Sequence, residues 1–487
     1  MTLAQFVPFL PEIFLATAGF VVLLLGIPLG RGGVRPLALF GAASLGVTGI
    51  LVWMFGRPAE GPMVILGDML VIDQMAVFFK LLVLAAGMVA IFMAAGFLER
   101  FGYGGGEFVS LIIFATVGMF VMASGASLAS LYVGLELMAL SVYVLVGYFK
   151  LEIKSNEGAV KYFVLGAASS AILLYGISLI YGSLGTLDLH EIRESLIAVP
   201  TANPMLVLGM VLVSFGMLFK VAAVPFHVWT PDAYEGAPTP VTAFISVAPK
   251  AAAFAMFMRI FFDAFAPGVE HWRVVLWVAS AATMIYGNVA ALTQDNVKRM
   301  LAYSSIAHAG YALMGLVAFS EMGAWALLMY MLIYAIMNLG AFGFVILLES
   351  KGYAGEKIVD YAGLARRHPG AALGMLIFML ALAGIPPTAG FMGKLYLFAA
   401  AVEGGYVVLT VIAVIMSAVS LFYYFRIVVQ MYLQDGDEEG LEPAELLRDR
   451  WTEAMIAVCV VATMLIGVWP RPIVGWAKSA AGALGMM

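Results

Sequence analysis

Long apolar runs separated by short polar interruptions constrain the fold of this chain more than any other feature. Of its 487 residues, 63% are hydrophobic and 11% are charged, against about 25% charged residues in a soluble domain. With a window of about 20 residues, the length that crosses a bilayer, the chain divides into about fourteen apolar segments. Only helices and closed barrels satisfy their backbone groups in lipid. We therefore predict an all-α polytopic membrane protein.

The predicted segments fill almost the whole chain. They lie at about residues 7–28, 36–55, 74–97, 107–123, 127–149, 156–183, 204–235, 238–265, 273–293, 297–318, 322–349, 370–402, 404–433 and 452–477. Met1–Gln5 carries no positive charge, and the apolar run after it continues to about Leu29. The N-terminus is therefore expected to lead into the first membrane helix rather than to be a cleaved signal peptide.

Basic residues are distributed unevenly between the two alternating sets of loops. One set, with the helix ends beside it, holds Arg31, Arg35, Arg100, Lys150, Lys154, Lys161, Lys298, Arg299, Lys351, Lys357, Arg366, Arg367, Arg448 and Arg450. The other set and the C-terminal tail hold only Arg57, Arg193, Arg259, Arg273, Arg471 and Lys478. By the positive-inside rule the first set faces the cytoplasm, so both termini are expected on the outer side of the membrane.

Charge and cysteine content narrow the partners and cofactors. The net charge of −5 gives no general basic character, so nucleic acid is not expected as a partner. The single cysteine, Cys459, cannot form an internal disulfide or hold a cysteine-bound zinc ion or iron–sulfur cluster by itself. No flavin or nucleotide motif is evident either, so no metal and no cofactor are expected in this chain.

Four ionisable side chains lie deep inside predicted membrane helices: Glu136, Lys220, Lys250 and Lys394. A charge at the bilayer centre costs roughly 2.5–3.5 kcal/mol on insertion scales, so such residues normally mark an ion or proton path. A Glu–Lys pair that only holds helices together is the alternative. Three lysines against one glutamate leave charge that this structural role does not explain, and we predict a proton path.

Two further basic residues lie within apolar segments but closer to their ends. Lys80 is about two turns into its helix, so its four-carbon stem is favoured to extend to the membrane surface, with a buried position as the alternative. Arg426 is similar, and Tyr423 and Tyr424 beside it are expected to form part of an interfacial aromatic belt.

Prolines interrupt the helices that carry the three lysines. A proline inside a helix leaves the carbonyl four residues earlier without its backbone donor. The carbonyls concerned are those of Val221 for Pro225, Ile245 for Pro249, and Leu382 and Ala383 for Pro386 and Pro387. Such backbone survives at membrane depth only inside protein or beside a wet cavity. We therefore predict that the seventh and twelfth helices, at 204–235 and 370–402, are broken as in transporters.

The two broken helices also indicate an internal repeat. They are five elements apart, and an odd offset reverses direction through the bilayer, as in an inverted repeat. His308 precedes Lys394 by 86 residues, much as Glu136 precedes Lys220 by 84. The predicted parts are helices 1–3 (1–106), a first five-helix repeat of helices 4–8 (107–265), a second of helices 9–13 (273–433), and helix 14 (452–487).

Two histidines accompany the buried charges. His308 lies in a predicted helix among the hydroxyl side chains of Tyr303, Ser304, Ser305 and Tyr311. An unperturbed imidazole titrates near pH 6.5, which suits it to passing protons. A neutral histidine that only joins two helices is the alternative, and the neighbouring lysines favour a relay. His227 follows Pro225 and is expected to bridge the helix break or to cap it.

Three longer stretches carry a resemblance to a known family. They are PFHVWTPDAYEGAPTP at 225–240, QDNVKRMLAYSS at 294–305, and Gly384–Lys394. These stretches resemble the antiporter-like membrane subunits of respiratory complex I and their Mrp antiporter relatives, and the resemblance extends over nearly the whole chain. A lysine at the position of Lys394 is similar to the N-type subunits of bacterial NADH-quinone oxidoreductase, whereas M-type subunits carry glutamate there. L-type subunits carry a long C-terminal extension that this sequence lacks.

The resemblance implies a proton-translocating membrane subunit of a redox-driven NADH-quinone oxidoreductase in the bacterial inner membrane, with both termini periplasmic. Glu136 and Lys220 would form a coupled pair, Lys250 would bridge the centre of the bundle, and Lys394 would lead to the second half-channel. Flavin, iron–sulfur clusters and quinone are expected in partner subunits. The expected partners are other membrane subunits of complex I, the lipid bilayer and protons. A subunit of an Mrp-type cation/proton antiporter is the alternative.

Residue and motif together give one set of candidate site residues. The predicted proton-transfer residues are Glu136, Lys220, Lys250, His308 and Lys394, and the predicted supporting residues are Pro225, His227, Pro249, Pro386 and Pro387.

Overall fold

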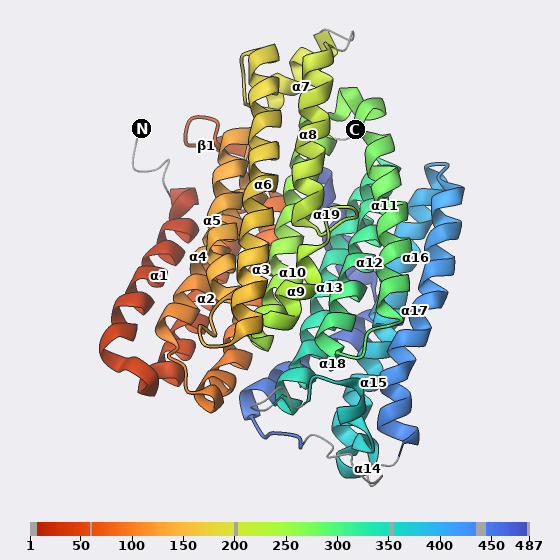
Figure 1. Ribbon diagram of the computed structural model, residues 1–487. Coiled ribbons are helices and arrows are strands. Elements are labelled where there is room, and N and C mark those ends of the chain that lie inside the picture. Colours follow the sequence, from red (N-terminus) through yellow and green to blue (C-terminus); the bar gives the residue numbers. More distant parts are fainter. Residues whose placement is uncertain (1–6, 59–60, 199–202, 350–354, 435–444, 485–487) are drawn as a thin grey trace.

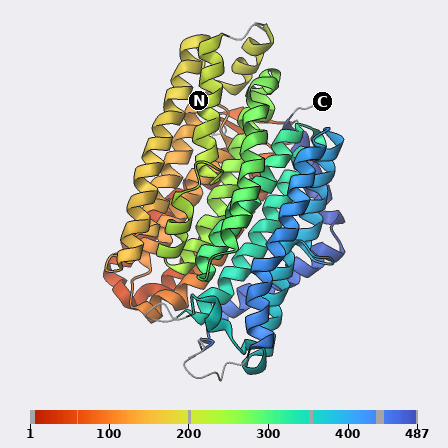
Figure 2. The ribbon, with the colours of Figure 1, turned by 45° about the vertical axis from the view of Figure 1, so that its right-hand side comes forward.

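The computed structural model of the protein describes residues 7–58, 61–198, 203–349, 355–434 and 445–484. Long helices run side by side in one bundle, and the view turned by 45° shows the same arrangement (Figures 1 and 2). Helices from the N-terminal part form one flank, and those labelled α16 and α17 form the opposite flank (Figure 1). The predicted helical membrane architecture is confirmed.

The N-terminal part contains five long helices and one short hairpin. Its elements are α1 (Leu10–Leu29), α2 (Val34–Phe55), β1 (Met63–Ile65), β2 (Leu70–Ile72), α3 (Gln74–Phe101), α4 (Gly106–Ser124) and α5 (Leu128–Val146). Polar side chains fix two helix starts. Asp73 accepts a hydrogen bond from the backbone N–H of Ala76 at 2.8 Å, and Ser127 forms a capping box with Ser130 at the start of α5. The antiparallel hairpin was not foreseen in the sequence.

The middle part contains the most deeply buried helix. Its elements are α6 (Ile153–Leu184), α7 (Leu189–Ala198), α8 (Pro204–Lys220), α9 (Trp229–Gly236) and α10 (Thr239–Phe257), which continues into a π-helical turn at Met258–Ala264. All residues of α10 are buried, and the helix continues through Pro249. A helix that is buried on every side lies in the core of its bundle, so α10 is the element around which the others pack.

The C-terminal part contains the second broken helix. Its elements are α11 (Val269–Ala291), α12 (Val297–Ala318), α13 (Glu321–Leu348), α14 (Leu364–Arg367), α15 (Pro369–Ala383), α16 (Ala389–Glu403), α17 (Val407–Leu433), α18 (Arg450–Val468) and α19 (Arg471–Ala481). The predicted breaks are confirmed, since residues 221–228 separate α8 from α9 and residues 384–388 separate α15 from α16.

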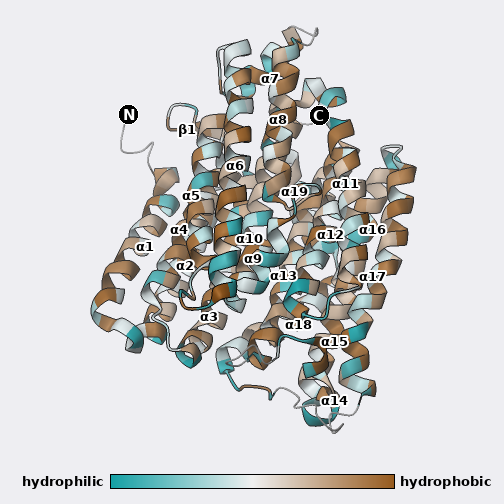
Figure 3. Ribbon diagram, viewed as in Figure 1, coloured by the Kyte–Doolittle hydropathy of each residue, from teal (hydrophilic) through white to brown (hydrophobic). Residues whose placement is uncertain are grey.

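Hydropathy is arranged as a lipid-facing protein requires. Within the described ranges, eleven helical stretches are long and apolar enough to cross a bilayer. Large apolar side chains on the outer helices are exposed, among them Leu24 of α1 and Val408 of α17. Hydrophilic residues are seen around α9 in the middle of the view (Figure 3), whereas α10 and α13 are mainly apolar. The centre of the bundle is therefore an apolar core that contains a smaller number of buried polar and charged side chains.

One predicted segment boundary is wrong. The segment expected at 452–477 is two helices, because α18 ends at Val468 and α19 begins at Arg471. Pro470 lies between them and has no backbone N–H to continue the first helix. Trp476 of α19 packs on Phe78 of α3 with ring centroids 4.5 Å apart. The chain therefore turns back onto the bundle after α18.

Candidate functional site

A serine joins the first two predicted proton-transfer residues. Glu136 of α5 and Lys220 at the end of α8 have Oε1 and Nζ 3.9 Å apart. Ser170 of α6 lies between them: its hydroxyl donates to Glu136 at 2.5 Å and accepts from Lys220 Nζ at 3.1 Å. The Lys220 side chain is 3% exposed, whereas Glu136 retains 27%. This cluster therefore extends from the edge of the bundle to its interior.

The break after Lys220 is held by side chains from neighbouring elements. Trp229 at the start of α9 donates its indole N–H to the carbonyl of Phe219 at 3.2 Å. The backbone N–H of Val224 in the break donates to the hydroxyl of Thr283 in α11 at 2.9 Å. Both bonds satisfy polar groups that a continuous helix would have satisfied itself, as backbone at membrane depth requires. These two hydrogen bonds therefore stabilise the break that ends α8 at Lys220.

Lys250 lies at the centre of the bundle and bonds to a single residue of α12. Its Nζ donates to the carbonyl of Ser305 at 2.9 Å and also to the hydroxyl of Ser305. Two tyrosines share that hydroxyl, with the Tyr334 oxygen at 2.8 Å and the Tyr234 oxygen at 3.3 Å. The Lys250 ammonium group therefore lies beside a group of buried hydroxyls from Tyr234 of α9, Ser305 of α12 and Tyr334 of α13.

His308 lies one turn further along α12 and is bonded on both ring nitrogens. Nδ1 is 2.7 Å from the Tyr330 hydroxyl and Nε2 is 3.2 Å from the Tyr424 hydroxyl. Tyr424 continues the series to Ser304, with their oxygens 2.5 Å apart. An imidazole with a proton-bearing partner on each nitrogen can accept a proton on one side and release one on the other. This geometry is what a relay needs.

Lys394 of α16 binds the end of the other half of its broken helix. Its Nζ donates to the carbonyls of Leu382 at 3.1 Å and Ala383 at 2.9 Å. These are the two carbonyls that the proline pair was predicted to leave without donors. The Ser417 hydroxyl of α17 accepts a third bond at 2.9 Å. The lysine therefore joins the two half-helices across their break.

The ring of Tyr311 connects Lys394 with the histidine. Lys394 Nζ lies 4.8 Å from the centre of the Tyr311 ring, and the His308 and Tyr311 rings are 5.8 Å apart. Lys250, His308 and Lys394 thus form one group of neighbouring polar side chains, but among the described residues ring contacts and not direct hydrogen bonds link the three to one another. Among the described residues no hydrogen bond joins this group to Lys220, so the Glu136–Ser170–Lys220 cluster is separate from it.

The charge balance differs between the two groups. Lys220 faces Glu136, but within the described part of the chain no carboxylate lies within ion-pair distance of Lys250 or Lys394. Both of these lysines are almost fully buried. A buried ammonium without a counter-charge is costly, and hydroxyls and carbonyls compensate only part of that cost. Lys250 and Lys394 are therefore buried lysines whose positive charge, when protonated, is compensated only by hydroxyls and carbonyls.

Sequence reasoning missed several residues of the site. Those that contact the predicted residues directly are Ser170, Tyr234, Tyr330, Tyr334, Ser417 and Tyr424. The prediction that Tyr423 and Tyr424 form an interfacial belt is wrong, because both side chains are fully buried. The sequence did contain a signal for these residues, namely hydroxyl side chains at helical spacing inside apolar segments. Buried hydroxyls need hydrogen-bond partners, so such side chains could have been predicted to contact the buried charges.

The predicted supporting residues have different outcomes. Pro225, Pro386 and Pro387 lie in the two breaks, whereas Pro249 lies inside the continuous helix α10. His227 is buried against Tyr286, with ring centroids 4.4 Å apart. Its Nδ1 has no hydrogen-bond partner among the described residues. His227 therefore lies within the break, and its expected role in bridging or capping the break stays a prediction.

Two other buried ion pairs lie outside these clusters. Lys80 donates to Glu12 at 2.6 Å, and both side chains are at most 8% exposed, so the expectation that Lys80 reaches the membrane surface is wrong. Arg259 binds both carboxylate oxygens of Asp73, at 2.5 and 2.7 Å. Because each cation has its own carboxylate, these pairs hold helices together and leave no unmatched charge.

Charged and polar side chains also bind one another at the end of the bundle that bears the basic loops. Lys298 is 3.1 Å from Glu356, and Glu349, just beyond α13, accepts a hydrogen bond from Thr239. Burial raises the pKa of the Glu349 carboxyl, and the charge of nearby Lys298 opposes that rise. Across the described ranges, no group of three or more His, Cys, Asp or Glu side chains could hold a metal ion.

Known proteins resemble this chain over most of its length. A family model described as NADH:quinone oxidoreductase/Mrp antiporter matches residues 125–420, a range that contains all five predicted proton-transfer residues. Subunit N of NADH-quinone oxidoreductase from Trichlorobacter lovleyi is 45% identical over 88% of each chain. Subunit N 2 from Rhizobium meliloti is 45% identical over 94% of each chain.

Solved structures share the fold. A chain of respiratory complex I from Thermus thermophilus matches with a TM-score of 0.79 and 32% identity, over 96% of this chain and 98% of its own. A chain of the Mrp complex from a Dietzia species matches with a TM-score of 0.84 over 99% and 98%, but its 22% identity shows the fold alone. The chain belongs to the antiporter-like membrane subunit family of NADH-quinone oxidoreductases, together with the N subunits.

Proposed function

We propose that this chain translocates protons as a membrane subunit of a redox-driven NADH-quinone oxidoreductase. The observation that carries the proposal is the series of buried proton-bearing side chains from Lys250 through His308 to Lys394, in a chain whose relatives are N subunits. Intramembrane ionisable groups that face the interior of a bundle are the usual components of proton relays.

The proposed roles follow from the contacts. Ser170 carries a proton between Glu136 and Lys220, because its hydroxyl donates to one and accepts from the other. Lys250 exchanges protons with the hydroxyls at Ser305, and His308 passes them between the Tyr330 and Tyr424 hydroxyls. Lys394 holds the proton at the second break. Water between Lys220 and Lys250, and between His308 and each of Lys250 and Lys394, would complete the path when the complex turns over.

Charge state couples these steps. A carboxylate near a lysine favours the protonated ammonium, and a change in that carboxylate's position or charge favours proton release. Moving one charge through 100 mV requires about 2.3 kcal/mol, which corresponds to a change of about 1.7 pKa units. The change in free energy when a single buried pair such as Glu136 and Lys220 rearranges is of that order.

The topology that goes with this role has fourteen crossings. Counting α8 with α9 and α15 with α16 as single broken crossings supports that number, and α1 and α2 form two crossings. The two proposed inverted repeats, 107–265 and 273–433, would each contain one broken helix. Residues 1–106 and 452–487 flank them. The uneven basic loops support both termini on the periplasmic side of a bacterial inner membrane.

Redox chemistry in this proposal belongs to partner subunits. Flavin, iron–sulfur clusters and quinone would be bound there, and this chain would contact other membrane subunits of the complex and the lipid bilayer. An Mrp-type cation/proton antiporter subunit is the second candidate, supported by the shared fold. The 45% identity to N subunits over most of the chain favours the oxidoreductase.

The test uses the whole complex, reconstituted into sealed vesicles, with NADH oxidation and vesicle acidification measured together. For Lys250→Ala we expect normal assembly and fewer protons moved per electron than in the unaltered complex. Lys150→Ala, at an exposed loop position, is the control and should pump normally. Unchanged pumping in the alanine variants of Lys220, Lys250 and Lys394 would overturn the proposal. Sodium-dependent proton exchange by the chain without redox partners would favour the antiporter.

A further inference from the structure

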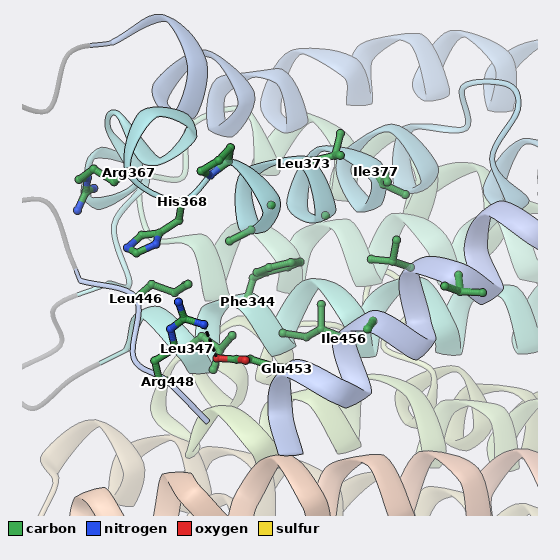
Figure 4. Close-up of a pocket in the computed structure, with 17 residues that line it drawn as sticks. Phe344, Leu347, Arg367, His368, Leu373, Ile377, Leu446, Arg448, Glu453 and Ile456 are labelled. Atoms are coloured by element: carbon green, nitrogen blue, oxygen red, sulfur yellow. Dashed lines mark ion pairs between the residues drawn. The ribbon is translucent and has the colours of Figure 1, made fainter. Parts of the chain in front are cut away.

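A cavity of about 640 Å³ lies beside the last helices, away from the buried clusters described above. Its walls come from the end of α13, the start of α15 and the start of α18 (Figure 4). The α15 and α18 walls begin at this end of the bundle, where the basic loops gather. The cavity therefore opens at the level of the membrane surface.

The two ends of the cavity differ in chemistry. Arg367, His368, Arg448 and Glu453 gather at one end, whereas Leu373 and Ile377 lie further along α15 (Figure 4). Leu373 of α15 and Val461 of α18 are exposed on the outer surface, where lipid covers the helices. The cavity thus has a polar end, called the mouth, at Arg367, His368, Arg448 and Glu453, and it continues as an apolar groove along the side of the bundle. A molecule with a charged head and a hydrocarbon tail fits this pattern.

The mouth contains charges of both signs that do not satisfy each other. Arg448 Nη1 is 3.9 Å from Glu453 Oε1, beyond hydrogen-bonding distance. The Arg448 side chain is 80% exposed, so its guanidinium retains donors for another acceptor. Glu453 Oε1 is buried and has no hydrogen-bond partner among the described residues. Buried carboxylate oxygens normally accept a hydrogen bond, so we expect a cationic hydrogen-bond donor beside Glu453.

We propose that this cavity binds phosphatidylethanolamine, with its phosphate on Arg448, its ammonium on Glu453 and an acyl chain along Leu373 and Ile377. The phosphate is a strong acceptor for guanidinium groups, and the ammonium supplies three donors. A purely anionic headgroup satisfies Arg448 but places a second negative or neutral group against Glu453. Among the described residues that line the cavity, Glu453 is the one carboxylate, and it lies beside basic side chains. Glu453 therefore selects a zwitterionic lipid over an anionic one.

The first experiment measures lipid that stays with the purified complex. After extensive detergent washing, the retained phospholipids are extracted and quantified by mass spectrometry for the unaltered complex and for Glu453→Lys. We expect retained phosphatidylethanolamine to fall by one molecule per complex in Glu453→Lys and phosphatidylglycerol to replace it. Glu321→Gln, at the first turn of α13, is the matched control and should retain the lipid. Equal phosphatidylethanolamine in all three complexes overturns the proposal.

A second experiment leaves every charge in place. A photo-reactive amino acid at Leu373 in the otherwise unaltered complex is irradiated in vesicles of phosphatidylethanolamine and phosphatidylglycerol. Cross-linking to phosphatidylethanolamine beyond its share in the vesicle supports the proposal. Cross-linking in proportion to vesicle composition, or to a neighbouring subunit, overturns it. Neither readout depends on proton movement, so failure here and failure of the proposed function are distinguishable.

Discussion

Glu136 and Lys220 are joined by the hydroxyl group of a third residue, Ser170. Their charged atoms are 3.9 Å apart, and the Ser170 hydroxyl bonds to both, at 2.5 Å to the carboxylate and 3.1 Å to the ammonium. A direct ion pair would hold the proton on the lysine, whereas a hydroxyl between the two groups provides a route for transfer as well as attraction. The proposed proton transfer between Glu136 and Lys220 would pass through this hydroxyl.

Removing that hydroxyl tests the route. Hydrogen bonds to charged groups contribute about 1.5–3 kcal/mol, so Ser170→Ala should slow NADH-driven proton pumping by about tenfold with assembly retained. Ser169 is the matched control, because it is the neighbouring serine on α6 and bonds only to the Gly216 carbonyl, at 3.3 Å. Pumping measured in vesicles should be nearly normal in Ser169→Ala. Equal effects of the two substitutions would contradict the bridging role.

The histidine relay predicts a difference between two adjacent tyrosines. Tyr424 bonds to His308, whereas Tyr423 donates to Asn288 at 3.0 Å. Both are fully buried, so Phe substitution leaves the packing of each ring similar. Tyr424→Phe should lower pumping about tenfold or more, since positioned proton donors and acceptors contribute at least that much. Tyr423→Phe should have a small effect, and the opposite order would exclude Tyr424 from the relay.

The Glu12–Lys80 pair predicts a stability effect rather than a transport effect. Removing one partner of a buried pair leaves an unmatched charge and costs about 3–5 kcal/mol. Lys80→Met should therefore reduce the yield and thermal midpoint of the purified complex. The double variant Glu12→Met/Lys80→Met should recover most of that loss, because two apolar side chains of similar size leave no charge behind. Failure of the double variant to recover would show that the pair does more than hold α1 to α3.

Glu349 predicts a pH dependence of stability. Burial raises its pKa in the folded protein, so the folded state binds the proton more tightly than the unfolded state does. The resulting stabilisation is complete below the unfolded pKa of about 4.3 and is lost as pH rises through the folded value. Thermal midpoints between about pH 4.5 and 8 should fall less steeply with pH in Glu349→Gln. Glu403→Gln, at an exposed site on α16, should leave the slope unchanged.

The sequence alone contained the membrane architecture and the helix breaks. Apolar length decides whether a segment crosses a bilayer, and this property belongs to local sequence. Proline removes a backbone donor wherever it stands, and both breaks contain proline, but Pro249 lies inside the continuous helix α10, so proline alone does not decide where a helix breaks. The link between the proline pair and Lys394 was also visible, because the donors and acceptors are only 11 and 12 residues apart. The buried charges were recognised for the same reason, since an ionisable residue in an apolar run is costly whatever surrounds it.

The partners of those charges were decided only by tertiary structure. Ser170 lies 34 residues from Glu136 and 50 from Lys220, and Tyr424 lies 116 residues from His308. Lys80 and Glu12 are 68 residues apart. Hydropathy ranks each side chain by its own preference for water, but whether a tyrosine faces lipid or a histidine depends on how its helix is rotated against its neighbours. That rotation is set by the packing of the whole bundle, so the sequence located the charges and the fold determined which hydroxyls, carbonyls and carboxylates each of them contacts.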